Sequence, residues 1–158
     1  WHAAALTAPT VVAQIEGSAL AEAIRVSAWA YPVLEAVHLC SLAALFGGLL
    51  VLDLRLFGAG RDIGLRPLAR LSARVAAGGF LGAAGSGALL WASDASALSA
   101  NPAFLAKLAL ITVAGVNAAF FHLRDSARRH DRIAHLQAGV SLALWVGVIF
   151  AGRLIAYA

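Results

Sequence analysis

The sequence predicts an all-α protein: an integral membrane, antiparallel four-helix bundle preceded by a short interfacial helix. Hydrophobic residues make up 61% of the 158-residue chain and charged residues only 13%, too few to cover the surface of a soluble domain. Several apolar stretches reach the ~20 residues needed to cross a bilayer. Nine of the twelve basic residues lie between these stretches, in two clusters. The first contains Arg55, Arg61, Arg66, Arg70 and Arg74, and the second contains Arg124, Arg128, Arg129 and Arg132.

The two arginine clusters also predict the orientation of the chain. Short cytoplasmic loops of membrane proteins are enriched in Lys and Arg, whereas the connection 93–101 contains Asp94 and no basic residue. We therefore expect a multi-pass protein of the bacterial inner membrane with both termini in the periplasm. The positive charge then faces the lipid bilayer surface and the cytosol, and no motif for binding nucleic acid is present.

Two segments precede the expected bundle. Residues 1–17 lack the charged start and long apolar centre of a signal peptide, and we expect them to form a periplasmic tail. Residues 18–29 are too short and too polar to span a membrane, which predicts an amphipathic helix lying on its surface. Ser18 is a suitable N-cap for this helix.

The remaining residues, 30–158, predict one domain with four membrane spans. Pro32 suits the first turn of the first span, and Asn101 followed by Pro102 is a helix start signal for the third. In the second span, Gly78 and Gly82 form a small-xxx-small pair that favours close packing against another helix. The expected spans cover residues 31–57, 68–93, 102–122 and 133–157.

Ionisable residues inside a membrane are costly and are therefore functional candidates. Their depth, at about 1.5 Å per helical residue, divides them into two layers. The outer layer contains Glu35, His38, Lys107 and Arg153. A salt bridge from Glu35 to Lys107 or Arg153 would offset the cost of burying these charges. His38 is then a candidate proton acceptor or metal ligand beside that pair.

The inner layer lies close to the arginine clusters. Asp53 is a candidate for an ion pair or a proton site at this level. His122 and His135 lie near the expected headgroups, where they could extend to the interface or bind phosphate. Together with His38, these two histidines are also the candidate ligands for a cofactor or metal.

Haem b is one hypothesis for the histidines. Two axial histidines must lie at nearly the same depth, and His38 and His122 differ by roughly 20 Å along the helices. A haem shared by these two is therefore excluded unless a helix is broken. A haem held by His122 and His135, or by His38 alone, stays open.

Other chemistries are constrained by what the sequence lacks. The chain has no methionine and one cysteine, Cys40, which argues against a Cu(I) relay because Cu(I) prefers soft sulfur ligands. Cu(II) at His38, Glu35 or His2 is not excluded, and the outer layer also offers the His or carboxylate of a quinone site. No hydrolase, nucleotide-binding or zinc-finger motif is present, so we expect no enzyme activity of the isolated chain.

Several stretches resemble an uncharacterised family of bacterial inner-membrane proteins. That family is distantly similar to the membrane domains of CopD-type copper-resistance proteins and to cytochrome b-like four-helix bundles. The resemblance implies membership and architecture but no reaction. It is carried by WAYP at 29–32 with Glu35 and His38, LDLR at 52–55, Asn101-Pro102 with Lys107 and 117–122, and segments 141–145 and 151–157.

These observations predict a small inner-membrane subunit in redox or metal-linked periplasmic chemistry. Electron transfer with bound haem or quinone is the leading hypothesis. The alternatives are a component that transports an ion, a proton or copper, and a structural anchor for a periplasmic partner. The expected protein partners are a periplasmic redox or metal protein and a second copy of the chain.

Overall fold

The computed structural model describes residues 10–129 and 131–157. The predicted all-α bundle is confirmed, and each expected span matches a long helix to within three residues. The long helices are α3 (Ala30–Leu56), α4 (Leu65–Ser93), α6 (Pro102–Leu123) and α8 (Arg132–Leu154). The shorter elements are α1 (Val11–Glu16), α2 (Ala19–Val26), α5 (Ala95–Ala100), α7 (Ser126–Arg129) and the closing 3-10 turn Ile155–Tyr157.

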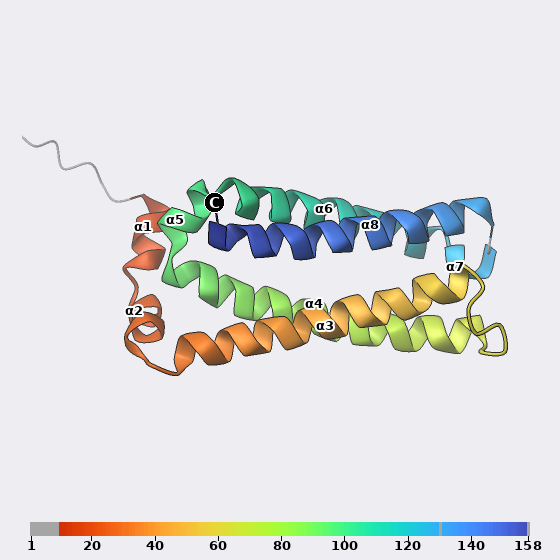
Figure 1. The fold of residues 1–158 in the computed structure, drawn as a ribbon, viewed down its shortest axis with the longest axis horizontal. Helices are drawn as coiled ribbons and strands as arrows, with labels where there is room; N and C mark the ends of the chain where they lie inside the picture. Colours follow the sequence, from red (N-terminus) through yellow and green to blue (C-terminus); the bar gives the residue numbers. More distant parts are fainter. Residues whose placement is uncertain (1–9, 130, 158) are drawn as a thin grey trace, which may run out of the picture.

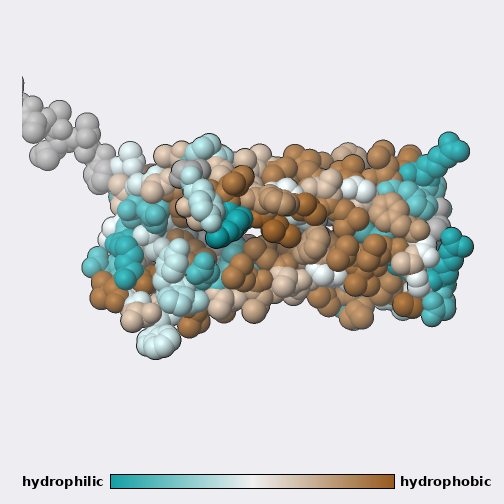
Figure 2. Space-filling view, in the orientation of Figure 1, coloured by the Kyte–Doolittle hydropathy of each residue, from teal (hydrophilic) through white to brown (hydrophobic). Residues whose placement is uncertain are grey.

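The surface of the bundle matches a lipid environment. All four long helices are long enough and apolar enough to cross a membrane. Figure 2 shows an apolar band across the middle of the visible face of the bundle, with hydrophilic groups gathered at its two ends. Large apolar side chains such as Leu81, Phe120 and Phe150 are exposed on it. Lipid tails cover such side chains, so the chain is a multi-pass membrane protein.

The four long helices pair into two hairpins (Figure 1). Helix α3 packs along α4, and α6 packs along α8. The two hairpins meet mainly through α3 and α8. Helices α4 and α6 are joined through α5 but are not among the closely packed pairs. The seam between the hairpins is therefore packed much less tightly than either hairpin.

Glycines bring α3 and α4 into backbone contact. A Cβ added to Gly79 would lie 2.5 Å from the backbone N of Leu45 and 2.6 Å from the carbonyl oxygen of Ser41, and one added to Gly82 would collide with the Ser41 hydroxyl. Gly78 has nothing within 4 Å of its Cβ position. Gly82 thus packs as the sequence indicates, but Gly79, three residues before it on the same helix face, contacts α3 in place of Gly78.

Helices α1, α2 and α5 cover one end of the bundle, here named the cap end (Figure 1). Helix α2 is the expected short helix with Ser18 as its N-cap, and residues 11–16, which belong to the segment expected as a periplasmic tail, form helix α1. Residues 1–9 lie outside the described part of the chain. Arg25 donates to the carbonyl oxygens of Glu16 and Ser93, at 2.9 and 3.0 Å. A cation is favourable there because these carbonyls end α1 and α4.

A carboxylate completes the cap end. Glu16 accepts a 2.8 Å hydrogen bond from the backbone N–H of Ser96, in the first turn of α5. The hydrogen bonds from Ser96 hold the pKa of the Glu16 carboxyl below its usual range. Two opposite charges thus stabilise the cap end. Arg25 lies at the C-terminal ends of α1 and α4, where a cation is favourable, and Glu16 lies at the N-terminus of α5, where an anion is favourable.

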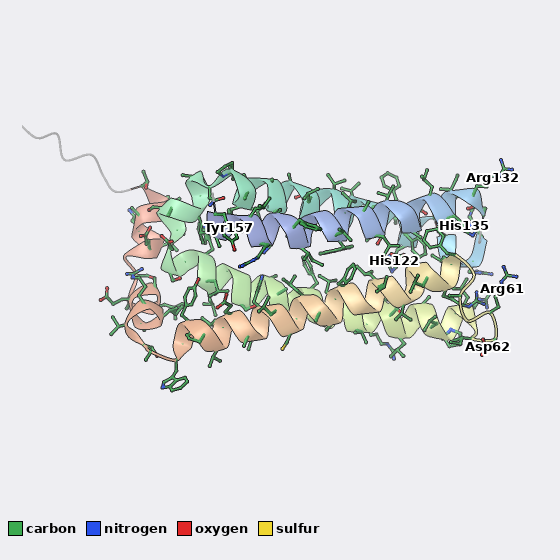
Figure 3. All side chains as sticks on the ribbon, viewed as in Figure 1. Arg61, Asp62, His122, Arg132, His135 and Tyr157 are labelled. Carbon is green, nitrogen blue, oxygen red and sulfur yellow. The ribbon has the colours of Figure 1, made fainter. Side chains whose placement is uncertain are left out.

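The α3–α4 loop and α7 form the opposite end, here named the arginine end. Arg61 and Arg132, one from each cluster, both lie there (Figure 3). Arg55 folds back and donates to backbone carbonyls of the loop. Arg124 forms a two-pronged ion pair with Asp131, at 3.1 and 2.6 Å, and Asp131 is also the N-cap of α8. The two clusters therefore share one end, as the loop pattern predicts.

Candidate functional site

His38 of α3 is anchored to α4 on the inside of the bundle. Its Nδ1 lies 3.1 Å from the hydroxyl oxygen of Ser86, and that hydroxyl lies 2.6 Å from the carbonyl oxygen of Gly82. Because a carbonyl oxygen only accepts, Ser86 donates its proton to Gly82 and accepts the proton on Nδ1 of His38. A Cβ at position 87 would lie 3.0 Å from Cε1 of the ring, so Gly87 leaves the space that the imidazole occupies.

This anchoring determines which ring nitrogen is available. A neutral His38 with its proton on Nδ1 carries its lone pair on Nε2. Among the described residues, no hydrogen bond engages Nε2. The Ala83 carbonyl lies near the ring as a further acceptor. His38 is thus held as a proton acceptor or metal ligand is held, with one nitrogen fixed and the other open.

Lys107 of α6 supplies a positive charge at the same level. Its Nζ lies 3.5 Å from the Cβ position of Gly152 in α8, and the ammonium group acts electrostatically on the His38 ring. Within the described residues, Lys107 forms no salt bridge. Figure 2 shows hydrophilic groups reaching into the apolar band at the seam between the hairpins. The His38 imidazole on one hairpin and the Lys107 ammonium group on the other are therefore close enough to interact electrostatically.

The other two members of the expected outer layer lie elsewhere. Glu35 is exposed because it stands three residues before His38, about 60° round the helix from the inward direction. Arg153 is also exposed; it donates to the Tyr157 hydroxyl at 2.7 Å and lies over that ring. The predicted salt bridge from Glu35 is therefore not formed among the described residues. The outer site reduces to His38 and Lys107.

Asp53 occupies a second polar site, near the arginine end. Its side chain is buried, at 4% exposure, and its Oδ2 atom has no hydrogen-bond partner. The Ser141 hydroxyl of α8 lies within reach of the carboxyl group. Leu52 and Leu56 are buried on either side of it in α3. A carboxyl group with an unsatisfied oxygen in such surroundings calls for a physical explanation.

Uncharged polar groups continue from this site toward the arginine end. Gln137 is one helical turn from Ser141 and is also buried. Its side-chain oxygen accepts a 2.7 Å hydrogen bond from Ser126 of α7, and its backbone carbonyl accepts one of 3.0 Å from Asn117 of α6. These hydrogen bonds connect α6, α7 and α8 on the side of Asp53 that faces the arginine end.

His122 and His135 both lie at the arginine end (Figure 3). Each donates Nδ1–H to the carbonyl oxygen four residues earlier in the chain, at 2.8 Å in both cases. The rings have different surroundings: His122 is exposed beside Phe121, whereas His135 lies against Phe57 of α3. Each ring is thus held by its own helix at the arginine end, as expected for histidines that lie at the membrane interface. His2 and His130 lie outside the described residues.

The structure also bears on metal binding. In residues 10–129 and 131–157, no three His, Cys, Asp or Glu side chains come together around a possible metal ion.

An apolar cluster separates the polar site at His38 from the one at Asp53, so the two sites are distinct. Its buried members are Leu45, Ala76, Ala114, Trp145 and Val148.

Sequence reasoning missed the uncharged partners of both sites. The sequence does not distinguish Ser86 and Ser141 from other serines, because a Ser hydroxyl within a helix can donate a hydrogen bond to its own backbone at little cost in free energy. Their spacing offers a usable signal. Ser86 follows Gly82 by four residues, and Ser141 follows Gln137 by four, so each pair shares one helix face.

Comparison with protein-family models, with curated proteins and with solved structures found no match. The resemblance to a bacterial inner-membrane family therefore stays a prediction. The fold and the sites define a class: a multi-pass α-helical membrane protein whose α3 carries two polar sites, at His38 and Asp53, each with a polar group of the opposite hairpin nearby.

Proposed function

We propose that this chain is a small redox subunit of the bacterial inner membrane that binds a quinone at the His38–Lys107 site. The observation that carries the proposal is the fixed Nδ1 of His38, which leaves Nε2 without a hydrogen bond among the described residues, while the Lys107 ammonium group, which forms no salt bridge there, acts electrostatically on the ring. The arginine clusters support an orientation with the arginine end in the cytoplasm and the cap end in the periplasm. The site then lies on the periplasmic side.

The chemistry of quinones matches this pair of groups. A quinone carbonyl accepts a hydrogen bond, which the Lys107 ammonium can donate. A quinol hydroxyl donates one, which Nε2 of His38 can accept. The remainder of the molecule is a flat apolar ring with a lipid-soluble tail, and on this proposal it enters from the lipid between α4 and α6, which are not among the closely packed helix pairs. Both redox forms thus find a partner at the site.

Haem at His38 is less well supported. The open Nε2 also suits an axial ligand whose other nitrogen is anchored. However, the Lys107 ammonium acts on the same ring, and a positive charge there disfavours a metal cation at Nε2. A quinone carries no positive charge, so the same ammonium group favours it. The two hypotheses are separated by experiment.

The test is a titration of the purified protein with a short-chain ubiquinone and with menadione, followed by tryptophan fluorescence. We expect saturable binding that weakens about tenfold in His38→Ala and in Lys107→Gln, as for the loss of one hydrogen bond worth ~1.4 kcal/mol. Glu35→Gln is the matched control, since Glu35 lies one turn away but faces outward, and should leave binding unchanged.

Two results would overturn the proposal. One is equal affinity in the wild type, His38→Ala and Lys107→Gln, which would remove the site. The other is a Soret band in the visible spectrum of the wild type that disappears in His38→Ala, which would assign the ring to haem instead. Absence of any saturable binding would favour the transport or anchor alternatives.

A further inference from the structure

The Asp53 carboxyl group has no counter-charge. Its partner in the described structure is the neutral Ser141 hydroxyl, and no charged group acts on it electrostatically. On its own helix, Arg55 is turned away to the carbonyls of the α3–α4 loop. His38 and Glu35 lie at the far end of α3, roughly 22 Å or more away at 1.5 Å per residue.

The helices packed against α3 bring no charge to Asp53 either. The arginines of α4, namely Arg66, Arg70 and Arg74, are exposed. The charged groups of α2, Glu22 and Arg25, lie at the cap end, and so does Arg153 of α8. Arg132 of α8 is exposed. The remaining titratable group of α8 is His135, which bonds to the Asp131 carbonyl and lies against Phe57.

An ionised carboxylate in this position would be expensive. Burial in apolar surroundings disfavours the charged form unless a cation compensates it. A bound metal cation such as Na⁺ or Mg²⁺ takes several oxygen ligands, whereas the described residues offer this site one carboxyl group and one hydroxyl. A single proton needs no further ligands. It removes the charge and turns one carboxyl oxygen into a donor.

Access to Asp53 is one-sided. The residue stands three positions before Leu56, the last residue of α3, and thus about 5 Å from the helix end at the arginine end. Toward the cap end, the apolar cluster that includes Leu45, Trp145 and Val148 closes the bundle. The buried side-chain amide of Gln137, one helical turn before Ser141 in α8, lies toward the arginine end.

We infer that Asp53 is a membrane-embedded proton-binding site, which takes up one proton from the arginine end to give a neutral carboxylic acid beside Ser141. The reaction is carboxylate plus proton to carboxylic acid, with no other reactant. The site is separate from the quinone site, and its assignment holds whether or not a quinone binds at His38.

Infrared spectroscopy of the full chain in lipid tests this inference without requiring a reagent to reach the site. We expect the carbonyl stretching band of a protonated carboxyl group at neutral pH. An ordinary aspartate, with a pKa of ~3.9, is ionised at that pH and gives no such band. The band should be missing in Asp53→Asn, a neutral variant of the same shape that should fold. It should shift in frequency in Ser141→Ala, which loses the neighbouring hydroxyl.

Labelling with dicyclohexylcarbodiimide gives a second readout. This lipid-soluble reagent adds to protonated carboxyl groups, and peptide mass mapping should find the adduct on Asp53 and not on the ion-paired Asp131. A wild-type spectrum without the carbonyl band at neutral pH would overturn the inference, since Asp53 would then be ionised. A band that is abolished by adding Na⁺ would also overturn it, by showing a metal cation site in place of a proton site.

Discussion

The two hairpins of the bundle are held together in different ways. Along α3 and α4, glycines let the two backbones touch, as at Gly79 and Gly48. Along α6 and α8, hydrogen bonds and an ion pair fasten the ends instead. Asn101 donates to the Ile155 carbonyl at the cap end, and Arg124 pairs with Asp131 at the arginine end.

This difference explains where the polar sites lie. The closely packed hairpin carries both His38 and Asp53 on α3, whose backbone contacts that of α4. The second hairpin contributes the partner groups, Lys107 and Ser141, from helices with a less crowded interface. Both sites therefore lie at the seam between the closely packed hairpin and the more loosely packed one.

The largest effect is expected from a substitution in the glycine interface. Gly79→Leu would push its side chain into the backbone of α3, at Leu45 and Ser41, and should destabilise the protein by about 3 kcal/mol or more. Gly78→Leu makes the same chemical change one residue earlier, into open space, and should have little effect. Thermal unfolding in detergent measures both. Equal destabilisation by the two variants would mean that α3 and α4 do not pack through Gly79.

A smaller effect is expected in the second hairpin. Gln137→Leu removes the acceptor of the Ser126 hydroxyl, which is fully buried. An unsatisfied buried hydroxyl costs about 1–3 kcal/mol. Adding Ser126→Ala removes the unsatisfied group and should recover most of the loss. If the double variant is as unstable as the sum of both single variants, the Ser126–Gln137 hydrogen bond does not support this hairpin.

The sequence predicts the helices of both hairpins well because their signals are local. Apolar length predicts four spans, and Asn101 caps α6 while Pro102 opens it, as expected. The arginine clusters likewise predict that both loops lie at one end. Such features depend on residues close together in the chain, so no knowledge of packing is needed to find them.

The rotation of each helix could not be predicted in the same way. One residue separates Gly78, which meets open space, from Gly79 at the interface, and three residues separate the exposed Glu35 from the inward His38. All of the faces are apolar in a membrane helix, so hydrophobic periodicity does not show which one is inside. The sites were therefore predicted in part, through His38, Lys107 and Asp53, but without their hydroxyl partners.

The smallest effect is expected from the ion pair between Arg124 and Asp131 at the arginine end. The Arg124 guanidinium, together with the backbone N–H of Ala134, holds the pKa of the Asp131 carboxyl well below its usual range. Because this pKa is lower in the folded chain than in the unfolded one, the ion pair stabilises the fold above about pH 4 and its contribution is lost as the pH falls below that value. Both side chains are partly exposed, which keeps the effect small.

Asp131→Asn isolates this contribution, because Asn caps a helix as well as Asp does and only the charge is removed. At neutral pH the variant should melt roughly a few degrees below the wild type, and the two melting curves should approach each other as the pH falls below about 4 and converge only in stronger acid, where Asp131 is protonated in the folded chain too. Asp125→Asn, which removes a longer and more exposed pair with Arg128, should change less. A difference for Asp131→Asn that persists unchanged in acid would show that the ion pair does not fasten this end, and that α6 and α8 are held, like α3 and α4, by packing along their length.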